Sequence, residues 1–421
     1  MPMSQSFKER LFPIAEQLVE HYGTPFHIYD EVGIRETGEN LKKTFSAFPE
    51  FREYYAVKAL PNPRILELMR DMGFGFDCSS IAELVSSREI GASGEDLMLT
   101  SNNTSQDVFK VAADAGGCIL NLDDISLIEK VPDFPELICF RYNPGPRRSG
   151  NIIIGNPVEA KYGLTHDQMV EAYRMAQKRG AKRFGLHTMV ASNELDYTYI
   201  VETVRMILEV AEEVGKELDI RFDFVNIGGG LGIPYKPEQD TLDISTIAAE
   251  AESMFAAFKE RNDYAPRLFM ESGRFMTGPH GCLVTSAINS KDIYRKYIGV
   301  DASMSSLMRP ALYGSYHHID VVGKEDAPRD QVYDVVGSLC ENNDKFAIQR
   351  ELPAIDEGDV LVIHDTGAHG HAMGFQYNAN LRPKELLLKA DGSVELIRRE
   401  ETLDDYFATL NFTADRFTPG A

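Results

Sequence analysis

Two kinds of segment alternate between about residue 50 and about residue 280. Short apolar runs rich in β-branched and aromatic residues predict strands, and amphipathic segments between most of them predict helices. The strands are expected at residues 51–58, 74–78, 96–100, 118–122, 136–143, 183–190, 222–228 and 267–272. The helices are expected at residues 64–72, 81–90, 107–115, 167–179, 197–218 and 245–262, and glycines that directly follow three of them are typical C-terminal caps: Gly73, Gly91 and Gly116.

Eight strands that alternate with helices predict a (β/α)8 barrel, in which parallel strands close into a cylinder inside a layer of helices. We place this TIM-like barrel at residues 31–280 and assign the protein to the α/β class. An open, doubly wound sheet is the alternative, because its strands and helices alternate in the same way.

After about residue 280 the pattern changes to strand-like segments separated by turns that contain glycine and proline. These segments are residues 282–289, 294–301, 317–323, 331–338, 359–365, 385–389 and 393–398. They predict an antiparallel β domain, a sandwich or small barrel, at residues 281–421. Residues 1–30 are expected to join it, with an amphipathic helix at residues 5–22, a break at Thr24-Pro25 and a short strand at Phe26–Tyr29.

The composition narrows the classes of protein to consider. The chain of 421 residues has a formal net charge of −22, which disfavours nucleic acids and anionic membranes as partners because both attract basic patches. No apolar run reaches the roughly 18 residues of a membrane-spanning helix, and the N-terminal residues lack the apolar core of a signal peptide. The five cysteines are scattered and show no CxxC spacing, which favours reduced thiols and a cytoplasmic location.

The candidate chemistry lies where the predicted barrel strands end. The active site of such a barrel is built at the carboxyl ends of its strands. At these ends the sequence places a lysine, two carboxylates, a histidine, an arginine and a glycine-rich turn: Lys58, Asp77, Glu271, His187, Arg274 and Gly228–Gly230. This convergence on one rim predicts an active site.

Lys58 ends an apolar strand, so we expect partial desolvation to lower the pKa of its amine and to prepare it for covalent chemistry with a carbonyl compound. Glu271 is suited to pair with a protonated ring nitrogen, and His187 is suited to lie against such a ring or to donate to it. The ordinary alternatives are a lysine that reaches solvent, a glutamate in an internal salt bridge and a buried core histidine.

The run Gly228-Gly229-Gly230 follows the seventh predicted strand. Glycines allow backbone N–H groups to close around an anion, and barrels often bind phosphate after their seventh and eighth strands. A dinucleotide-binding fingerprint is a weaker interpretation, because Pro234 stands where that motif has its third small residue, and a plain tight turn is the simplest one. Arg274 is suited to bind a phosphate or a substrate carboxylate.

The predicted β domain adds further candidates. Cys340, which precedes Glu341, is a possible proton donor, although an inert buried cysteine is the commoner case. Arg309 and Tyr313 form a pair suited to a carboxylate. The run HDTGAHGH at residues 364–371 resembles a set of metal ligands, but it lacks the helical HExxH form and its glycines favour a turn, so no metal site is expected.

Together these residues resemble the fold-type III, alanine racemase-like pyridoxal-phosphate-dependent decarboxylases, and most closely diaminopimelate decarboxylase. The resemblance extends from about Thr24 to about Leu388. Its landmarks are Tyr55-Ala-Val-Lys58-Ala, Phe76-Asp-Cys-Ser-Ser-Ile-Ala-Glu-Leu84, Asn143-Pro, Lys161-Tyr-Gly163, Asn226-Ile-Gly-Gly-Gly-Leu-Gly232, Glu271-Ser-Gly-Arg274, Arg309-Pro-Ala-Leu-Tyr313, Cys340-Glu341 and Tyr377-Asn378.

The resemblance implies a role for each candidate. Lys58 would hold pyridoxal 5′-phosphate covalently, and Cys340 would return a proton to the α-carbon after carbon dioxide leaves. The other cofactor-binding residues would be Asp77, His187, Ser192, Gly228, Gly229, Gly230, Glu271, Arg274 and Tyr377. The substrate would be bound by Arg274, Arg309, Tyr313, Glu341 and Tyr377.

The resemblance also implies a reaction and a partner. The implied reaction converts meso-2,6-diaminopimelate to L-lysine and carbon dioxide. The family forms dimers in which the segment with Cys340 and Glu341 completes the partner's site, so a homodimer is expected. Three alternatives remain: a decarboxylase of D-ornithine, D-lysine or carboxynorspermidine, a non-catalytic cofactor-binding regulator of the same fold, and a metal-dependent barrel hydrolase.

Several positions depart from the family pattern. Leu60 stands where asparagine is usual, Ser272 where proline is usual and His369 where tyrosine is common. The sixth-strand motif, His187-Thr-Met-Val-Ala-Ser192, is longer than the common His-x-Gly-Ser, which leaves Ser192 as only a candidate for the usual phosphate-binding serine. One interpretation of these changes is a subfamily that acts on a different substrate.

Overall fold

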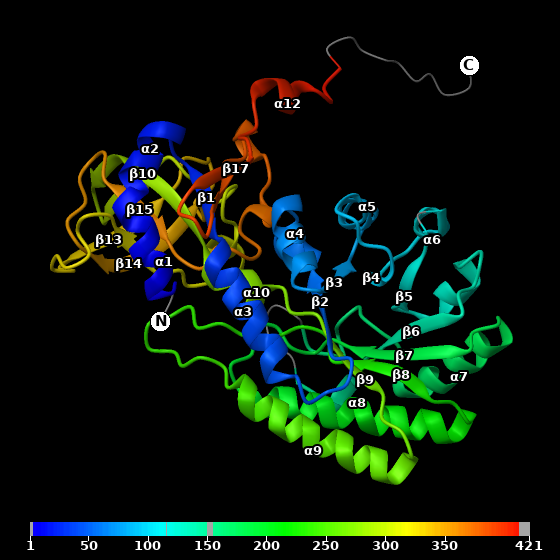
Figure 1. Cartoon of the computed structure of the whole chain (residues 1–421). Coiled ribbons are helices and arrows are strands. Elements are labelled where there is room, and N and C mark those ends of the chain that lie inside the picture. The colour runs from blue at the N-terminus through cyan, green and yellow to red at the C-terminus, as the bar shows by residue number, and fades with distance from the viewer. Residues whose placement is uncertain (1–2, 115, 150–154, 412–421) are drawn as a thin grey trace, which may run out of the picture.

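Eight parallel strands close into a barrel in the computed structural model of the chain, which describes residues 3–114, 116–149 and 155–411 (Figure 1). The order around the barrel follows the sequence, and the last strand pairs with the first. The strands are β2 (Arg52–Ala56), β3 (Gly75–Cys78), β4 (Gly94–Ser101), β5 (Cys118–Leu122), β6 (Leu137–Tyr142), β7 (Arg183–Thr188), β8 (Phe222–Asn226) and β9 (Arg267–Met270). The predicted barrel is therefore confirmed, and the open sheet is wrong.

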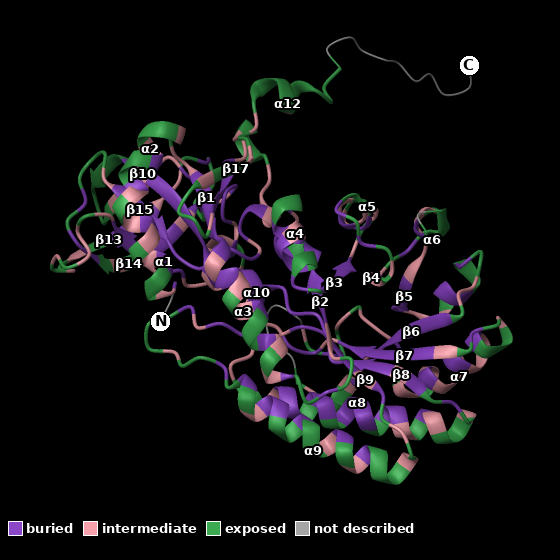
Figure 2. Ribbon diagram, viewed as in Figure 1, coloured by how far each residue is buried: buried purple, intermediate pink, exposed green. Residues whose placement is uncertain are grey.

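Helices lie around the barrel with their buried faces toward the strands and their exposed faces toward solvent (Figure 2). They are α4 (Pro63–Asp71), α5 (Ile81–Glu89), α6 (Gln106–Asp114), α7 (His166–Lys178), α8 (Tyr197–Leu218) and α9 (Ile244–Asn262), close to their expected positions. The sequence pattern did not predict α3 (Glu31–Thr44). Its two glycines, Gly33 and Gly38, are poor helix formers, and they lie against the side chains of His280 and Met72, where a larger residue would collide.

A second sheet of nine strands forms the other part of the fold. Seven strands follow the order β14-β13-β11-β10-β1-β16-β17; in addition, β15 pairs with β10, and β12 pairs with β15. The strands are β1 (Phe26–Asp30), β10 (Gly281–Asp292), β11 (Lys296–Val300), β12 (Ile319–Val321), β13 (Gln331–Val336), β14 (Lys345–Leu352), β15 (Val360–Ile363), β16 (Lys384–Leu388) and β17 (Val394–Arg398). The sheet is mixed rather than antiparallel as expected, because β1 lies parallel to β16 and β11 lies parallel to β13. The unpredicted β14 has several exposed polar positions that weaken its apolar alternation.

The N-terminal segment lies against this second sheet, and β1 lies within it between β10 and β16. The helix expected at residues 5–22 is divided into α1 (Gln5–Leu11), the 3-10 helix η1 (Phe12–Ile14) and α2 (Ala15–Tyr22), because Pro13 has no N–H to continue the α-helical pattern.

Residues 412–421, the end of the expected β domain, lie outside the described residues. The remaining short helices are η2 (Val57–Ala59), η3 (Ile125–Lys130), η4 (Gly145–Arg147), α10 (Arg274–Thr277), η5 (Gly278–His280), α11 (Arg309–Tyr313), η6 (His371–Met373), η7 (Tyr377–Ala379) and α12 (Leu403–Phe407). Within the described ranges, every helix is too short or too polar to cross a membrane.

Buried polar contacts join the second sheet to the segment that follows β2. Glu385 on β16 accepts hydrogen bonds from the Tyr29 hydroxyl at 2.6 Å and from Asn62 Nδ2 at 3.1 Å. The backbone N–H of His369 donates to the carbonyl oxygen of Ala59 at 2.8 Å. Since Ala59 and Asn62 follow Lys58 closely in the chain, the junction between the two parts of the fold fixes the backbone next to that lysine.

Glu53 lies on β2, one of the barrel strands, and is buried, with 1% of its surface exposed. One carboxyl oxygen accepts the backbone N–H of Ser272, and the other has no hydrogen-bond partner within the described residues. Burial raises the pKa of Glu53 to about 8, and the nearby negative charge of Glu271 adds to this. The folded protein therefore holds this carboxyl group in its neutral form at pH 7.

This raised pKa predicts that the protein loses folding stability as the pH rises from about 4.5 toward 8, because the unfolded chain ionises Glu53 first. Glu53→Gln keeps the acceptor for the Ser272 N–H and cannot ionise. The unfolding free energy of the variant minus that of the wild type should therefore grow by about 3 kcal/mol between pH 5.5 and pH 8.5. Denaturant titrations at the two pH values measure it, and a difference that does not change with pH would contradict the buried neutral carboxyl group.

Candidate active site

A cavity of about 320 Å³ opens at the carboxyl ends of the barrel strands, a volume in the range of small-molecule sites. Eight of the residues predicted for the site line it: Lys58, Asp77, His187, Ser192, Gly229, Gly230, Glu271 and Arg274. The other lining residues are Ala56, Ser79, Thr100, Asn102, Arg141, Tyr162, Met189, Asn193, Leu231, Gly273 and His369. Most of the polar residues that the sequence analysis selected because they end barrel strands therefore lie around this one cavity.

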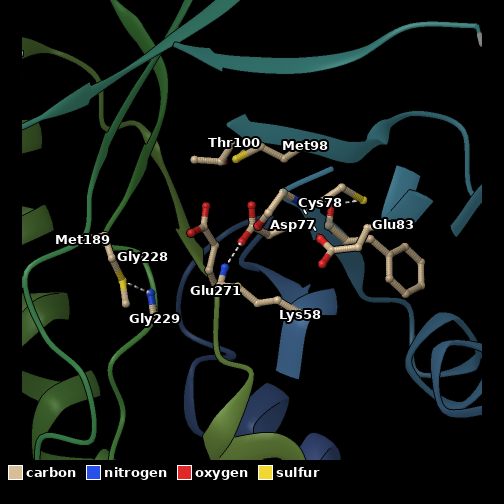
Figure 3. Close-up of polar contacts among 12 residues, drawn as sticks. Lys58, Asp77, Cys78, Glu83, Met98, Thr100, Met189, Gly228, Gly229 and Glu271 are labelled. Atoms are coloured by element: carbon tan, nitrogen blue, oxygen red, sulfur yellow. Dashed lines mark hydrogen bonds and ion pairs between the residues drawn. The ribbon is translucent and has the colours of Figure 1, made fainter. Parts of the chain in front are cut away.

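The amine of Lys58 points into this cavity from the short helix η2 that continues β2 (Figure 3). Its Nζ donates to Asp77 Oδ2, at the end of the neighbouring strand β3, at 2.9 Å. The lysine side chain is 48% exposed because it faces the open cavity, whereas Asp77 is buried. Burial lowers the pKa of Lys58, but attraction to Asp77 and Glu271 outweighs it, so the pKa lies above its ordinary value. The expectation of a lowered pKa is therefore wrong for the protein alone, because desolvation was considered without the two carboxylates.

Glu271 lies at the end of β9 and is held from two sides. Its Oε2 lies 3.1 Å from His187 Nε2, and its Oε1 accepts a hydrogen bond from Asn226 Nδ2 at 2.7 Å. Burial raises the pKa of Glu271, but His187 and Lys58 outweigh burial and hold the pKa below its ordinary value. The opposite holds for Asp77, whose pKa is raised by burial and by the charge of Glu271. Of the two carboxylates, Glu271 therefore keeps its negative charge more firmly.

The turn Gly228–Gly230 follows β8 and presents its backbone to the cavity. Gly229 and Gly230 line the cavity, whereas Gly228 does not. A Cβ atom on Gly229 would lie 2.3 Å from the carbonyl oxygen of Glu271, and Gly230 has a left-handed φ of 107°, so both positions require glycine. The N–H of Gly229 donates to the thioether sulfur of Met189 at 3.2 Å, a weak acceptor that an anion can replace (Figure 3).

Arg274 lines the cavity, and a second buried arginine, Arg309, contacts the same tyrosine, Tyr235. Arg309 and Tyr313 do not themselves line the cavity. Arg274 starts α10 and donates to the Tyr235 hydroxyl at 2.6 Å. The Arg309 guanidinium carbon, in α11, lies 5.3 Å from the ring centroid of Tyr235 and 5.8 Å from that of Tyr313. Burial lowers the pKa of Arg309, and the positive charge of Arg274 adds to this. Tyr235, which contacts both arginines, follows the glycine turn in a loop without strand-end or motif signal, and the sequence analysis missed it.

Three predicted residues lie elsewhere in the chain's own fold. Cys340, Glu341 and Tyr377 are exposed and do not line the cavity. The backbone N–H of Cys340 donates to the side-chain oxygen of Asn378, next to Tyr377, at 2.7 Å. These residues therefore form a separate surface cluster on the second part of the fold.

The histidine-rich run at residues 364–371 does not form a common ligand face. His364 Nε2 lies 3.3 Å from Asp320 Oδ2, and His371 Nδ1 lies 2.7 Å from an Arg382 nitrogen. His369 instead lines the cavity. Over the described ranges, no group of three or more histidine, cysteine or acidic residues is arranged to hold a metal ion.

The structure adds lining residues that the sequence analysis did not select. Thr100 and Arg141 lie at the ends of β4 and β6, so the strand-end rule, applied to every strand, would have found both. Arg141 forms an ion pair with Asp123 at 3.3 Å, and its guanidinium carbon lies 4.4 Å from the ring centroid of Tyr162. Met189 and Asn193 belong to the loop after β7, where no local pattern marks a site.

Comparisons with known proteins agree with this geometry. The sequence profile described as "Pyridoxal-dependent decarboxylase, pyridoxal binding domain" matches residues 34–278. Protein TabA from Pseudomonas amygdali pv. tabaci is 46% identical over 421 residues, which cover 100% of this chain and 99% of TabA. Diaminopimelate decarboxylase from Methanothermobacter thermautotrophicus is 36% identical over 408 residues, which cover 95% of this chain and 94% of the relative.

A solved structure is similar over nearly the whole chain. The crystal structure of diaminopimelate decarboxylase from M. jannaschii in co-complex with L-lysine superimposes with a TM-score of 0.88 at 28% identity, covering 95% of this chain and 94% of that one. The chain belongs to the pyridoxal-dependent decarboxylases. It is a carboxy-lyase whose cofactor is pyridoxal 5′-phosphate, as the resemblance implied.

The cavity of this decarboxylase fits its cofactor. The Lys58 amine faces open space, and the glycine turn offers backbone N–H groups where a side chain would collide. Two buried polar atoms near the amine, Asp77 Oδ1 and His187 Nδ1, have no hydrogen-bond partner within the described residues. Buried polar groups are rarely left unpaired, so a polar ligand is expected to complete this site.

Gly229→Ala is expected to weaken binding of pyridoxal phosphate to the apoenzyme about tenfold or more, because the added Cβ would lie 2.3 Å from the Glu271 carbonyl oxygen and displace the turn. Absorbance titration of the apoenzyme with pyridoxal phosphate measures the dissociation constant. Gly299→Ala in β11 is the matched control, because its Cβ would make only ordinary contacts at 3.5 Å. Equal affinities of the two variants would contradict the assigned role of the turn.

Proposed function

We propose that this decarboxylase acts on an amino acid with a second, distal carboxylate, and that its substrate is meso-2,6-diaminopimelate, which gives L-lysine and carbon dioxide. The observation that carries the proposal is the pair of buried arginines in contact with Tyr235, namely Arg274 and Arg309, which are 7% and 2% exposed. Neither forms an ion pair with a carboxylate of the described residues, and hydroxyl groups of Tyr235 and Ser315 are their side-chain acceptors.

Burying a cation without a counter-charge is costly, so these two arginines favour anionic ligands. The cofactor phosphate and the distal substrate carboxylate are two such ligands. A substrate whose distal end is only an ammonium group, such as D-ornithine or D-lysine, would place a third positive charge beside them. This electrostatic argument favours a dicarboxylic substrate over a simple diamine precursor.

A related substrate is the second candidate, because Protein TabA, at 46% identity, is more similar than the diaminopimelate decarboxylase from Methanothermobacter thermautotrophicus at 36%. His369 and the longer loop from His187 to Ser192 both reach the cavity. Both depart from the family pattern described in the sequence analysis, which is consistent with a different substrate. Any such amino acid with a distal carboxylate would still fit the two arginines.

The proposed roles follow from the contacts of each residue. Bound pyridoxal phosphate supplies an electron sink for the bond to the departing carboxylate. Lys58 holds the cofactor, and Asp77 accepts or returns a proton at the Lys58 Nζ that it contacts. Glu271, fixed by His187 and Asn226, would hold the ring nitrogen of the bound cofactor through its negative charge.

The remaining side chains bind the two anionic groups. The N–H groups of Gly229 and Gly230, together with Arg274, hold the phosphate, with Ser192 and Tyr377 as further phosphate ligands. Arg309 and Tyr313 bind the distal carboxylate of the substrate. Gly228, which does not line the cavity, shapes the turn through its left-handed φ of 70°.

A homodimer would bring the missing groups to the site. Cys340, Glu341 and Tyr377 are exposed on the chain's own fold, which supports the proposal that they project into the cavity of a partner subunit. In that position Cys340 returns the proton to the α-carbon and Glu341 contacts the distal amine.

The five cysteines are unpaired in the structure, which supports a reducing compartment such as the cytoplasm as the place of action.

Carbon dioxide release from a panel of amino acids tests the proposed substrate. The panel is meso-2,6-diaminopimelate, carboxynorspermidine, D-lysine and D-ornithine, each at the same concentration with the holoenzyme. We expect kcat/KM for meso-2,6-diaminopimelate to exceed that for D-lysine and D-ornithine by about 100-fold or more, because only the former pairs with the buried arginines. Preferred turnover of D-lysine or D-ornithine would refute the proposal.

Complementation between two inactive variants tests the shared site. Lys58→Ala and Cys340→Ala are each expected to be slow as homodimers, for different reasons. When the two chains are co-expressed, about half of the dimers are mixed and each mixed dimer has one intact site, so activity should recover to about a quarter of wild type. No recovery in mixed dimers, isolated through a different affinity tag on each of the two chains, would mean that each chain builds its own site.

A further inference from the structure

One side chain from the second part of the fold lines the cavity. Of the described residues around the cavity, His369 alone comes from the chain beyond β10. It lies in the loop between β15 and β16. A residue that crosses from one part of the fold into the other's cavity is a candidate for substrate contact.

The loop around His369 is rigidly held. A Cβ atom on Gly367 would lie 1.9 Å from the Thr277 carbonyl oxygen, and one on Gly370 would lie 2.3 Å from that of Thr366. The backbone N–H of His369 is bound to the carbonyl oxygen of Ala59, the residue after Lys58, at 2.8 Å. The close packing and this hydrogen bond fix the backbone of His369, from which the side chain reaches the cavity wall.

His369 also has a φ of 56°, the left-handed conformation that residues with side chains rarely adopt. Such a conformation is costly and persists where the surrounding structure enforces it, commonly at ligand sites. The surrounding contacts therefore hold His369 in this conformation.

Three positive groups act electrostatically on the imidazole of His369. Burial lowers the pKa of His369 well below its ordinary value, and Arg274, Arg309 and Lys58 lower it further. The ring is therefore neutral near pH 7, with one nitrogen that donates and one that accepts. None of the described residues forms a hydrogen bond with it. The surrounding positive charge disfavours an ammonium group at this place and favours an anionic oxygen.

We propose that His369 is a specificity-determining residue whose imidazole N–H donates a hydrogen bond to the distal carboxylate of the substrate, beside Arg309. This inference rests on the proposed function, because it assumes a substrate with a distal carboxylate. It adds His369 to Arg309 and Tyr313 as a residue that selects this carboxylate, and His369 lies on the loop that contacts the backbone after Lys58.

Two amino-acid probes that differ only in the distal carboxylate test the inference with the holoenzyme. They are 2-aminopimelate, which has that group, and 2-aminoheptanoate, which lacks it. The change in cofactor absorbance on titration gives a dissociation constant for each. The wild-type enzyme is expected to prefer 2-aminopimelate by about 100-fold, since the extra carboxylate accepts hydrogen bonds from His369 and from the groups of Arg309 and Tyr313.

The variants His369→Phe and His369→Tyr form a matched pair, because both carry a six-membered ring on the same strained backbone and only tyrosine can donate. His369→Phe is expected to reduce the preference about tenfold while leaving the dissociation constant of 2-aminoheptanoate within about twofold. His369→Tyr is expected to restore part of the preference. Melting temperatures of the two variants should agree, since the backbone cost is shared.

The outcomes separate the two proposals. If the wild-type enzyme does not prefer 2-aminopimelate, it does not recognise a distal carboxylate, and the proposed function is wrong. A wild-type preference that His369→Phe retains in full would leave the proposed function standing and overturn the role of His369. Equal weakening of both probes in His369→Phe would indicate a purely structural residue, and would also overturn the inference.

Discussion

Two buried carboxylates, Asp77 and Glu271, share the mouth of one barrel, and their mutual repulsion constrains the rest of the site. Each needs a positive or donating neighbour because a buried charge without one is costly. Lys58 supplies it for Asp77, and His187 with Asn226 supply it for Glu271. The result is an amine, an imidazole and two carboxylates fixed around a cavity of about 320 Å³. This arrangement suits a cofactor that carries an aldehyde at one position and a basic ring nitrogen at another.

The second part of the fold gives the cavity its opposite electrostatic character. Arg309 lies on α11, outside the barrel, and joins Arg274 through the ring of Tyr235. The site is therefore polarised, with carboxylates around the reactive amine and two guanidinium groups around Tyr235. A ligand with a positive group near one end and negative groups toward the other matches this polarity. The loop that carries His369 ties the two parts together, because its backbone is bound to the residue after Lys58.

The barrel was predictable because its signals are local. Each of the eight strands is a short apolar run, and glycine caps such as Gly73, with a φ of 83°, mark where helices end. The strand-end rule then collected Lys58, Asp77, His187 and Glu271 on one rim. The features that could not be predicted from the sequence depend on contacts between residues far apart in the chain. The parallel pairing of β1 with β16 joins segments more than 350 residues apart, and Tyr235 gains its role only from two arginines that fold against it. The pKa of Lys58 was predicted in the wrong direction for the same reason, since its carboxylate partners come from other strands.

The central claim is that the Lys58 amine, placed between Asp77 and Glu271, is the group that holds pyridoxal phosphate. Borohydride reduction of the holoenzyme, followed by proteolysis and mass spectrometry, tests it most directly because reduction makes the attachment permanent. The account predicts one phosphopyridoxyl group on the peptide that contains Lys58, with loss of the visible absorbance band. A label on a different lysine, or a holoenzyme whose band disappears without any labelled peptide, would contradict it.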